Sequence, residues 1–119
     1  MKTKTILFFA GLLGVISVSM GAMGAHALKA MISEESLISF LTGSRYNMYH
    51  ALVLLALVPL KDHLSPKWHS VSSFCMVIGT LLFSGSIYLL STSEITGLQL
   101  NSLLGPITPI GGLILITGW

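Results

Sequence analysis

The sequence predicts an all-α integral membrane protein: a bundle of four transmembrane helices with a short extra helix in its first loop. Of the 119 residues, 53% are apolar and only 8% are charged, whereas an ordinary soluble domain carries roughly 25% charged residues. Long, nearly uncharged stretches recur along the chain, and a helix needs about 20 apolar residues to cross a bilayer. Six basic and four acidic side chains cannot coat the core of a soluble domain, so we expect lipid to surround this one.

The apolar stretches predict a single domain over residues 1–119, with spans at about 6–27, 45–60, 71–91 and 103–119. The second and fourth spans are short for a bilayer. The first loop contains Ser33 followed by Glu34 and Glu35. This pattern is typical of a helix start, because serine caps the first free N–H groups and acids favour the positive end of the helix dipole. We expect Gly43 to end this short helix just before the second span.

Lysine and arginine are distributed unevenly between the two sides that this topology defines. One side carries Lys2, Lys4, Lys61 and Lys67, and the opposite side carries Lys29 and Arg45. Positively charged short loops stay in the cytoplasm. The bias therefore predicts a multi-pass protein of the cell (inner) membrane with both termini in the cytoplasm.

The first span has a second interpretation, as a cleaved secretory signal peptide. Lys2 and Lys4 precede an apolar run that ends in Ala25-His26-Ala27, which has the Ala-x-Ala form of a cleavage site. The apolar run is long for a signal peptide, so we favour a retained span and keep cleavage as the alternative.

Small residues recur at helical spacing in three of the expected spans. They are Gly14, Ser17, Gly21, Gly24 and Ala25 in the first, Ser72, Cys75, Gly79 and Ser86 in the third, and Gly105, Thr108, Gly111 and Gly112 in the fourth. Because lipid tails are as apolar as leucine, helices in a membrane associate through close packing at such residues. We therefore expect a tight bundle without a wide pore.

Polar and ionisable residues concentrate at the extracytoplasmic ends of the expected spans. The candidate cluster consists of His26, Lys29, Arg45, Tyr46, Tyr49, His50, Tyr88 and Thr108. Ionisable groups inside a membrane are costly and usually face the bundle interior, so they suggest a functional site. The alternative is a purely structural cluster, since tyrosine anchors helix ends at the interface and arginine reaches out to the headgroups.

No catalytic pattern is visible in the chain: there is no nucleophile–base pair, glycine-rich phosphate loop, paired carboxylates or Cys-x-x-Cys. We therefore expect no enzymatic activity. His26 and His50 could ligate a metal or haem at similar depth, with Met20 and Met23 as thioether ligands. Steps of three residues give these side chains no shared face, so we expect no metal and no cofactor. A net charge of +2 without a basic cluster argues against nucleic acid as a partner.

Four segments, taken in order, resemble one known family. They are Gly24-Ala-His-Ala-Leu-Lys29, Thr42-Gly-Ser-Arg-Tyr-Asn-Met-Tyr-His-Ala51, Leu82-Phe-Ser-Gly-Ser-Ile-Tyr-Leu-Leu90 and Leu104-Gly-Pro-Ile-Thr-Pro-Ile-Gly-Gly112. Together they span nearly the whole chain. They are similar to the YgdD-like family of small bacterial inner-membrane proteins, a domain of unknown function whose animal relatives form the transmembrane protein 256 family.

The resemblance implies a four-helix membrane protein without an established activity. The recurring motifs of the family match His26, Lys29, Arg45, Tyr46, Tyr49, His50, Ser84, Gly85, Tyr88, Pro106 and Gly111-Gly112. Family members continue for another turn or more beyond the position of Trp119. The resemblance therefore also implies that the cytoplasmic end of the last span is shortened here.

Our leading interpretation is a membrane protein whose outward-facing Arg/Tyr/His cluster binds a lipid or a membrane-protein partner. The alternative is a small transporter or channel. That function requires a homo-oligomer, because one bundle of this size has little room for a pore. A redox or haem-binding subunit is the weakest of the three interpretations.

Overall fold

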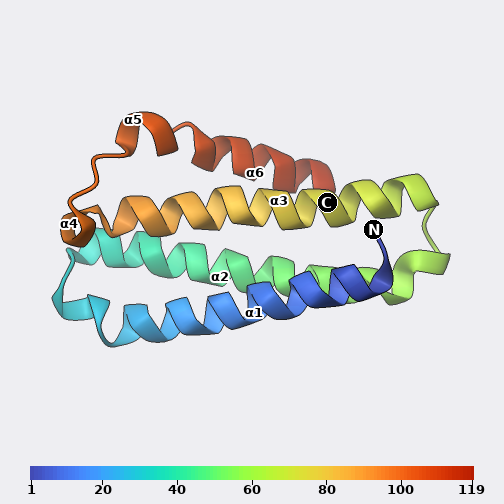
Figure 1. Cartoon of the computed structure of the whole chain (residues 1–119), viewed down its shortest axis with the longest axis horizontal. Helices are drawn as coiled ribbons and strands as arrows, with labels where there is room; N and C mark the ends of the chain where they lie inside the picture. Colours follow the sequence, from blue (N-terminus) through green and yellow to red (C-terminus); the bar gives the residue numbers. More distant parts are fainter.

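The computed structural model describes residues 1–119, and every regular element in it is helical. In chain order the elements are α1 (Thr3–Ala25), η1 (Leu28–Ala30), α2 (Glu34–Leu57), η2 (Pro59–Asp62), α3 (Pro66–Ser91), α4 (Ser93–Thr96), α5 (Asn101–Leu104) and α6 (Ile107–Gly118). The long segments α1, α2, α3 and α6 run antiparallel to their chain neighbours along the length of the molecule (Figure 1). The all-α class predicted from the sequence is confirmed.

Three helical segments are long and apolar enough to cross a membrane: Thr3–Ala25, Pro66–Ser91 and Asn101–Gly118. Helix α2 does not reach this level of hydropathy, because its middle carries a run of polar residues. Helix α3 begins at Pro66 instead of residue 71, since Ser65 caps it and proline suits the first helical position. The fourth expected span is interrupted between α5 and α6 at Pro106, which lacks the N–H that a continuous helix would use.

The prediction of a separate short helix in the first loop is wrong. Helix α2 runs without interruption over Glu34–Leu57, so the expected short helix and the second span are one element. Ser33 caps this helix, as predicted. Gly43 does not end it but lies inside it, where a methyl group would come within 2.9 Å of the Ile87 side chain. The glycine therefore serves the close approach of α2 to α3.

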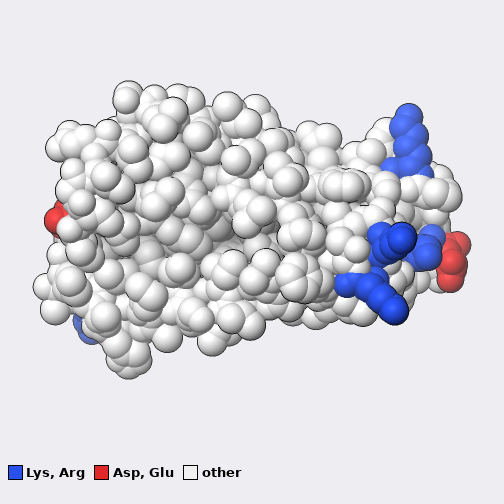
Figure 2. Space-filling view, in the orientation of Figure 1, with Lys and Arg blue, Asp and Glu red and all other residues white.

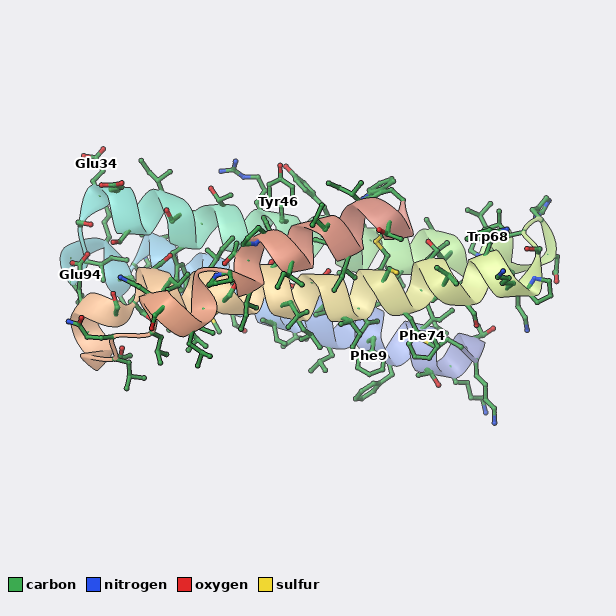
Figure 3. The ribbon with its side chains drawn as sticks, turned by 90° about the horizontal axis from the view of Figure 1, so that it is seen from above. Phe9, Glu34, Tyr46, Trp68, Phe74 and Glu94 are labelled. Atoms are coloured by element: carbon green, nitrogen blue, oxygen red, sulfur yellow. The ribbon has the colours of Figure 1, made fainter.

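The four long segments pack in chain order, α1 on α2, α2 on α3 and α3 on α6. The molecule measures 47 × 28 × 17 Å and is a flattened layer. Figures 1 and 3 together show α1 and α3 toward one face of this layer and α2 and α6 toward the other. The main apolar core, which includes Ile6, Leu13, Leu54 and Met76, lies between α1, α2 and α3. On the face of the layer where α2 and α6 lie, two cavities lined by α2, α3 and α6 mark a groove. We call it the α2–α6 groove.

Small residues bring α6 directly against α3. A methyl group built at Gly111 would lie 2.5 Å from the backbone nitrogen of Phe83. Ser86 and Thr108 share a hydrogen bond of 2.6 Å across the same interface. The predicted close packing through small residues is confirmed for α3 and α6. In α1 it holds for Gly24, whose added methyl group would lie 2.6 Å from the Leu41 side chain, but not for Gly14, which has nothing within 4 Å.

Charged residues gather at the two ends of the layer, and the middle of the face seen in Figure 2 is free of them. One end carries Lys2, Lys4, Lys61, Asp62 and Lys67, and the other carries Lys29, Glu34, Glu35 and Glu94. We call these the lysine-rich end and the acidic end.

Glu94 joins two loops at the acidic end. Its carboxylate accepts hydrogen bonds from the Ser36 hydroxyl at 2.8 Å and from the Ser33 backbone N–H at 3.0 Å, which ties α4 to the start of α2. These bonds, with that from Ser36 first, hold the pKa of the Glu94 carboxyl below its ordinary value because they stabilise the charged form.

The α3–α6 contact predicts that Gly111→Val destabilises the protein. The added side chain meets the α3 backbone, which cannot move aside, so overpacking should lower the free energy of unfolding by about 1–3 kcal/mol. Denaturation in mixed micelles, followed by circular dichroism, measures this change. Gly14→Val is the matched control and should unfold as the parent does; equal effects of the two variants would contradict the packing described.

The Glu94 contact predicts a pH-dependent tie between α4 and α2. A carboxyl whose pKa is depressed on folding contributes stability above its unfolded pKa and loses that contribution as the pH falls through its folded value. Glu94→Gln should therefore speed amide exchange around Ser33 and Ser36 at neutral pH and make no difference in acid. Glu35→Gln, which removes an exposed acid outside the contact, serves as the control. Identical exchange of Glu94→Gln and the parent at neutral pH would show that the tie does not form.

Candidate functional site

Helix α2 positions four of the eight candidate residues, Arg45, Tyr46, Tyr49 and His50, and its period separates them. Successive side chains on a helix are about 100° apart. Three pairs therefore point in three directions: Ser44 and Asn47 toward α1 and α3, Tyr46 and His50 toward the α2–α6 groove, and Arg45 and Tyr49 along its exposed rim. The continuous polar run in the sequence thus becomes a buried face, a groove face and a rim.

The buried face of α2 carries interhelical hydrogen bonds. The hydroxyl groups of Ser17 and Ser44 each donate to the backbone carbonyl of the other residue, at 2.7 and 2.9 Å. The Ser84 hydroxyl of α3 donates to the Gly43 carbonyl at 2.8 Å. These bonds fix how far α1, α2 and α3 are shifted along one another.

Asn47 and Tyr88 extend this buried polar layer. Asn47 is 1% exposed, and its Nδ2 amide donates to the Tyr88 hydroxyl at 3.0 Å. The Asn47 Oδ1 atom has no partner within the chain. The Tyr88 ring packs on Phe40 with 5.1 Å between the ring centroids, so the sequence candidate Tyr88 belongs to helix packing in this arrangement.

Aromatic rings line the middle of the α2–α6 groove. The Tyr46 ring lies edge-on to Phe83 of α3 and to Tyr49, with 5.5 Å between centroids in both pairs. The His50 ring approaches Trp119 at 6.4 Å, and its Nδ1 atom lies 2.7 Å from the Tyr46 carbonyl. Because a carbonyl only accepts, Nδ1 carries the proton of this hydrogen bond.

Arg45 lies on the rim without a partner. Its side chain is exposed, and no hydrogen bond or ion pair joins its guanidinium to another residue of the chain. The acidic residue nearest to it in the chain, Glu35, precedes it by ten residues, which is about 15 Å of helix. Figure 3 shows Tyr46, the neighbour of Arg45, roughly midway between Glu34 at one end and Trp68 at the other. The positive charge therefore stands alone in the middle of the layer.

The α2–α6 groove changes from polar to apolar along its length. Toward the acidic end, a cavity of about 280 Å³ is lined by Glu35, Ser36, Ser39, Ile87, Leu90, Ser91 and Thr108. Toward the lysine-rich end, a second cavity of about 370 Å³ has a lining that includes Val53, Ala56, Leu60, Met76 and Trp119. Arg45 and Tyr46 come between these two cavities along α2. The groove thus has the polarity profile of an amphiphile.

The predicted polar cluster does not converge at one point. Arg45, Tyr46, Tyr49 and His50 share the groove and its rim, Tyr88 lies in the buried layer, Thr108 bonds Ser86, and His26 and Lys29 lie in the exposed turn after α1. The Ser17–Ser44 pair aligns α1 with α2, which separates His26 from His50 by about 22 Å along the helix axis. The expectation that these two histidines lie at similar depth is wrong.

The structure adds residues that the sequence did not single out. Asn47 is the most buried polar side chain of α2. Trp119 reaches His50 across the groove. Helical spacing alone shows that Asn47 and Tyr46 point in different directions, but not which direction is covered. No group of three or more His, Cys, Asp or Glu side chains is placed to hold a metal ion.

These features define a small helical membrane protein whose one central charge lies on an exposed groove. The chain belongs to the family described as "Protein of unknown function (DUF423)", whose model matches residues 20–112.

Relatives match over nearly the whole chain. A membrane protein of Bacillus subtilis, YwdK of the UPF0382 group, is 38% identical over 98% of this chain and 90% of its own length. A UPF0382 membrane protein of Schizosaccharomyces pombe is 37% identical, covering 97% of this chain and 95% of its own. The UPF0382 inner membrane protein YgdD of Escherichia coli is 34% identical over 100% of this chain and 86% of its own. No solved structure matches the chain. The family resemblance inferred from the four motifs is confirmed.

Proposed function

We propose that this protein binds the anionic headgroup of a membrane lipid at the rim of the α2–α6 groove, with Arg45 as the anchoring residue. The observation that carries the proposal is a full positive charge, exposed halfway along α2, with no acidic side chain of the chain in reach. A charge at membrane depth is costly unless an opposite charge or water offsets it. A lipid phosphate is the anion that a bilayer itself supplies.

The proposal includes α2 as a fourth membrane-crossing segment. Its 24 residues extend for about 36 Å, which exceeds the hydrocarbon thickness of about 30 Å. It packs between α1 and α3, both of which have the length and composition of spans. A helix held between two spans along its whole length shares their environment.

The Ser17–Ser44 pair sets the depth of Arg45. Counted along α1, Arg45 lies about 15 Å from the turn at His26 and about 18 Å from Lys4. Side chains on a helix lean toward its N-terminus, so the guanidinium reaches back toward the acidic end. A long side chain of this kind can meet a phosphate drawn below the usual headgroup level.

The residues around Arg45 suit a lipid headgroup. The planar guanidinium donates two parallel hydrogen bonds to phosphate oxygens. Tyr46 and Tyr49 are 42% and 47% exposed, and tyrosine rings with a free hydroxyl are typical of the boundary between lipid tails and headgroups. A charge, two phenols and an aromatic wall therefore form one continuous surface.

We further propose that the bound lipid comes from the outer leaflet. Four of the six basic residues, Lys2, Lys4, Lys61 and Lys67, lie at the end opposite to the one that Arg45 leans toward. The positive-inside rule assigns that lysine-rich end to the cytoplasm. The N-terminus lies at this end, where it donates a hydrogen bond to Ser70, and α6 runs toward it (Figure 1).

This proposal predicts that Arg45→Gln weakens the binding of phosphatidylglycerol. Loss of one charge-assisted contact, worth about 1.5–3 kcal/mol, should lower the affinity by about tenfold or more. The affinity of Arg45→Lys should lie between those of the parent protein and of Arg45→Gln, because lysine keeps the charge but loses the forked geometry. Native mass spectrometry of the detergent-solubilised protein, titrated with phosphatidylglycerol and phosphatidylcholine, measures lipid retention.

Lys29→Gln is the matched control, since it removes one positive charge from the exposed turn at the same end of the molecule. An equal loss of binding in Lys29→Gln and Arg45→Gln would indicate general charge attraction and contradict a specific site. Circular dichroism of each variant shows whether the helical fold is intact.

A further inference from the structure

The proposed headgroup site continues into the apolar cavity of the α2–α6 groove. Arg45, Tyr49 and Ala56 follow one another on α2 at steps of four and seven residues, which keeps them within about 40° of one another on the helix. Ala56 and Leu60 line the cavity of about 370 Å³ together with α3 and Trp119. The charge and the cavity therefore share one stripe of the same helix.

We infer that one acyl chain of the lipid bound at Arg45 occupies this cavity, an inference that rests on the proposed function. Sites for small ligands are concave and mostly apolar, with volumes of about 300–1,000 Å³, and the cavity falls in this range. The Ser72 hydroxyl in its lining donates to the Gly118 carbonyl. Because this hydroxyl already has a hydrogen-bond partner, an apolar occupant does not leave it unpaired.

The polarity of the groove determines in which direction the acyl chain of the bound lipid runs. Because side chains lean toward the N-terminus of their helix, Arg45 extends toward the acidic end, where the polar cavity contains Glu35, Ser36 and Thr108. The apolar cavity lies toward the lysine-rich end. A lipid of the leaflet at the acidic end has its phosphate on that side and its chains directed away from it. When its phosphate is drawn down to Arg45, an acyl chain in this orientation reaches past the bilayer centre to the apolar cavity.

A second copy of this chain fits the groove less well than a lipid. The four acidic side chains, Glu34, Glu35, Asp62 and Glu94, all lie in loops or at helix ends. A helix of a second copy that covers the cavity would bring no acidic side chain to the depth of Arg45. A lipid covers the cavity and also supplies the opposite charge.

Trp119 is an internal reporter of the cavity, because it is part of the lining. Trp68→Phe leaves it as the one tryptophan of the chain. This variant is reconstituted in two preparations of phosphatidylcholine vesicles. One contains brominated phosphatidylglycerol and the other an equal fraction of brominated phosphatidylcholine. The bromine atoms on the acyl chains quench indole fluorescence on contact. We expect brominated phosphatidylglycerol to quench Trp119 with an apparent affinity about fivefold higher than brominated phosphatidylcholine.

Two further substitutions test the cavity itself. Ala56→Phe fills the cavity. It should bring the ratio of the apparent affinities for brominated phosphatidylglycerol and brominated phosphatidylcholine close to one. Ala22→Phe, at an exposed position of α1 outside the cavity, should leave the preference unchanged. Arg45→Gln should also abolish the preference, because the headgroup then no longer holds the chain in place.

The outcomes separate this inference from the proposed function. Retention of phosphatidylglycerol that depends on Arg45, with equal quenching by both brominated lipids, would overturn the acyl-chain inference and leave the headgroup site standing. Retention that is unaffected by Arg45→Gln would overturn the proposed function itself. A dimer mass together with protection of Trp119 from both lipids would identify a second copy as the occupant and overturn the inference.

Discussion

Lipid offers no hydrogen bonds, so every polar group inside this helical layer depends on another group of the protein. The buried polar side-chain atoms meet this constraint, with the Oδ1 atom of Asn47 as the exception. Ser17 and Ser44 exchange hydrogen bonds between α1 and α2. The Thr80 hydroxyl donates a hydrogen bond of 2.6 Å to the Met76 carbonyl of its own helix. Arg45 is the conspicuous exception among charged groups, and its isolation is the physical basis of the lipid-binding proposal.

The order of packing explains why one helix carries such different groups. Each long helix packs on its chain neighbours, and α1 and α6 form the two edges of the layer. Helix α2 is consequently covered by α1 and α3 on one side and faces an open groove on the other. Asn47 and Arg45 are only two residues apart, yet the first is 1% exposed and the second is exposed. The buried side holds the layer together, and the open side is available to a ligand.

Apolar run length predicted α1, α3 and the last span, because a long uncharged stretch admits few other structures. It failed for α2. There the serine cap and the acids of the first turn looked like a separate helix, and Gly43 looked like its end. A glycine that ends a helix and a glycine that admits a neighbouring helix are identical in sequence; only the nearby Ile87 distinguishes them.

The grouping of Arg45, Tyr46, Tyr49 and His50 followed from local spacing. The separation of His26 from His50 depends on the Ser17–Ser44 alignment, which local spacing does not contain.

Lipid binding at Arg45 requires this residue to lie within the hydrocarbon, and therefore requires α2 to cross the bilayer. Spin labels at Leu52 and Leu55, two exposed positions of α2 beyond Arg45, test this in a Cys75→Ser background reconstituted in lipid vesicles. Collision with dissolved oxygen and with a water-soluble nickel chelate reports the depth of each label. The account predicts high oxygen and low nickel accessibility at both positions, with nickel accessibility rising toward a label at Ile38. Strong nickel accessibility at both Leu52 and Leu55 would mean that α2 lies in water, and would contradict the membrane-embedded charge on which the proposed function rests.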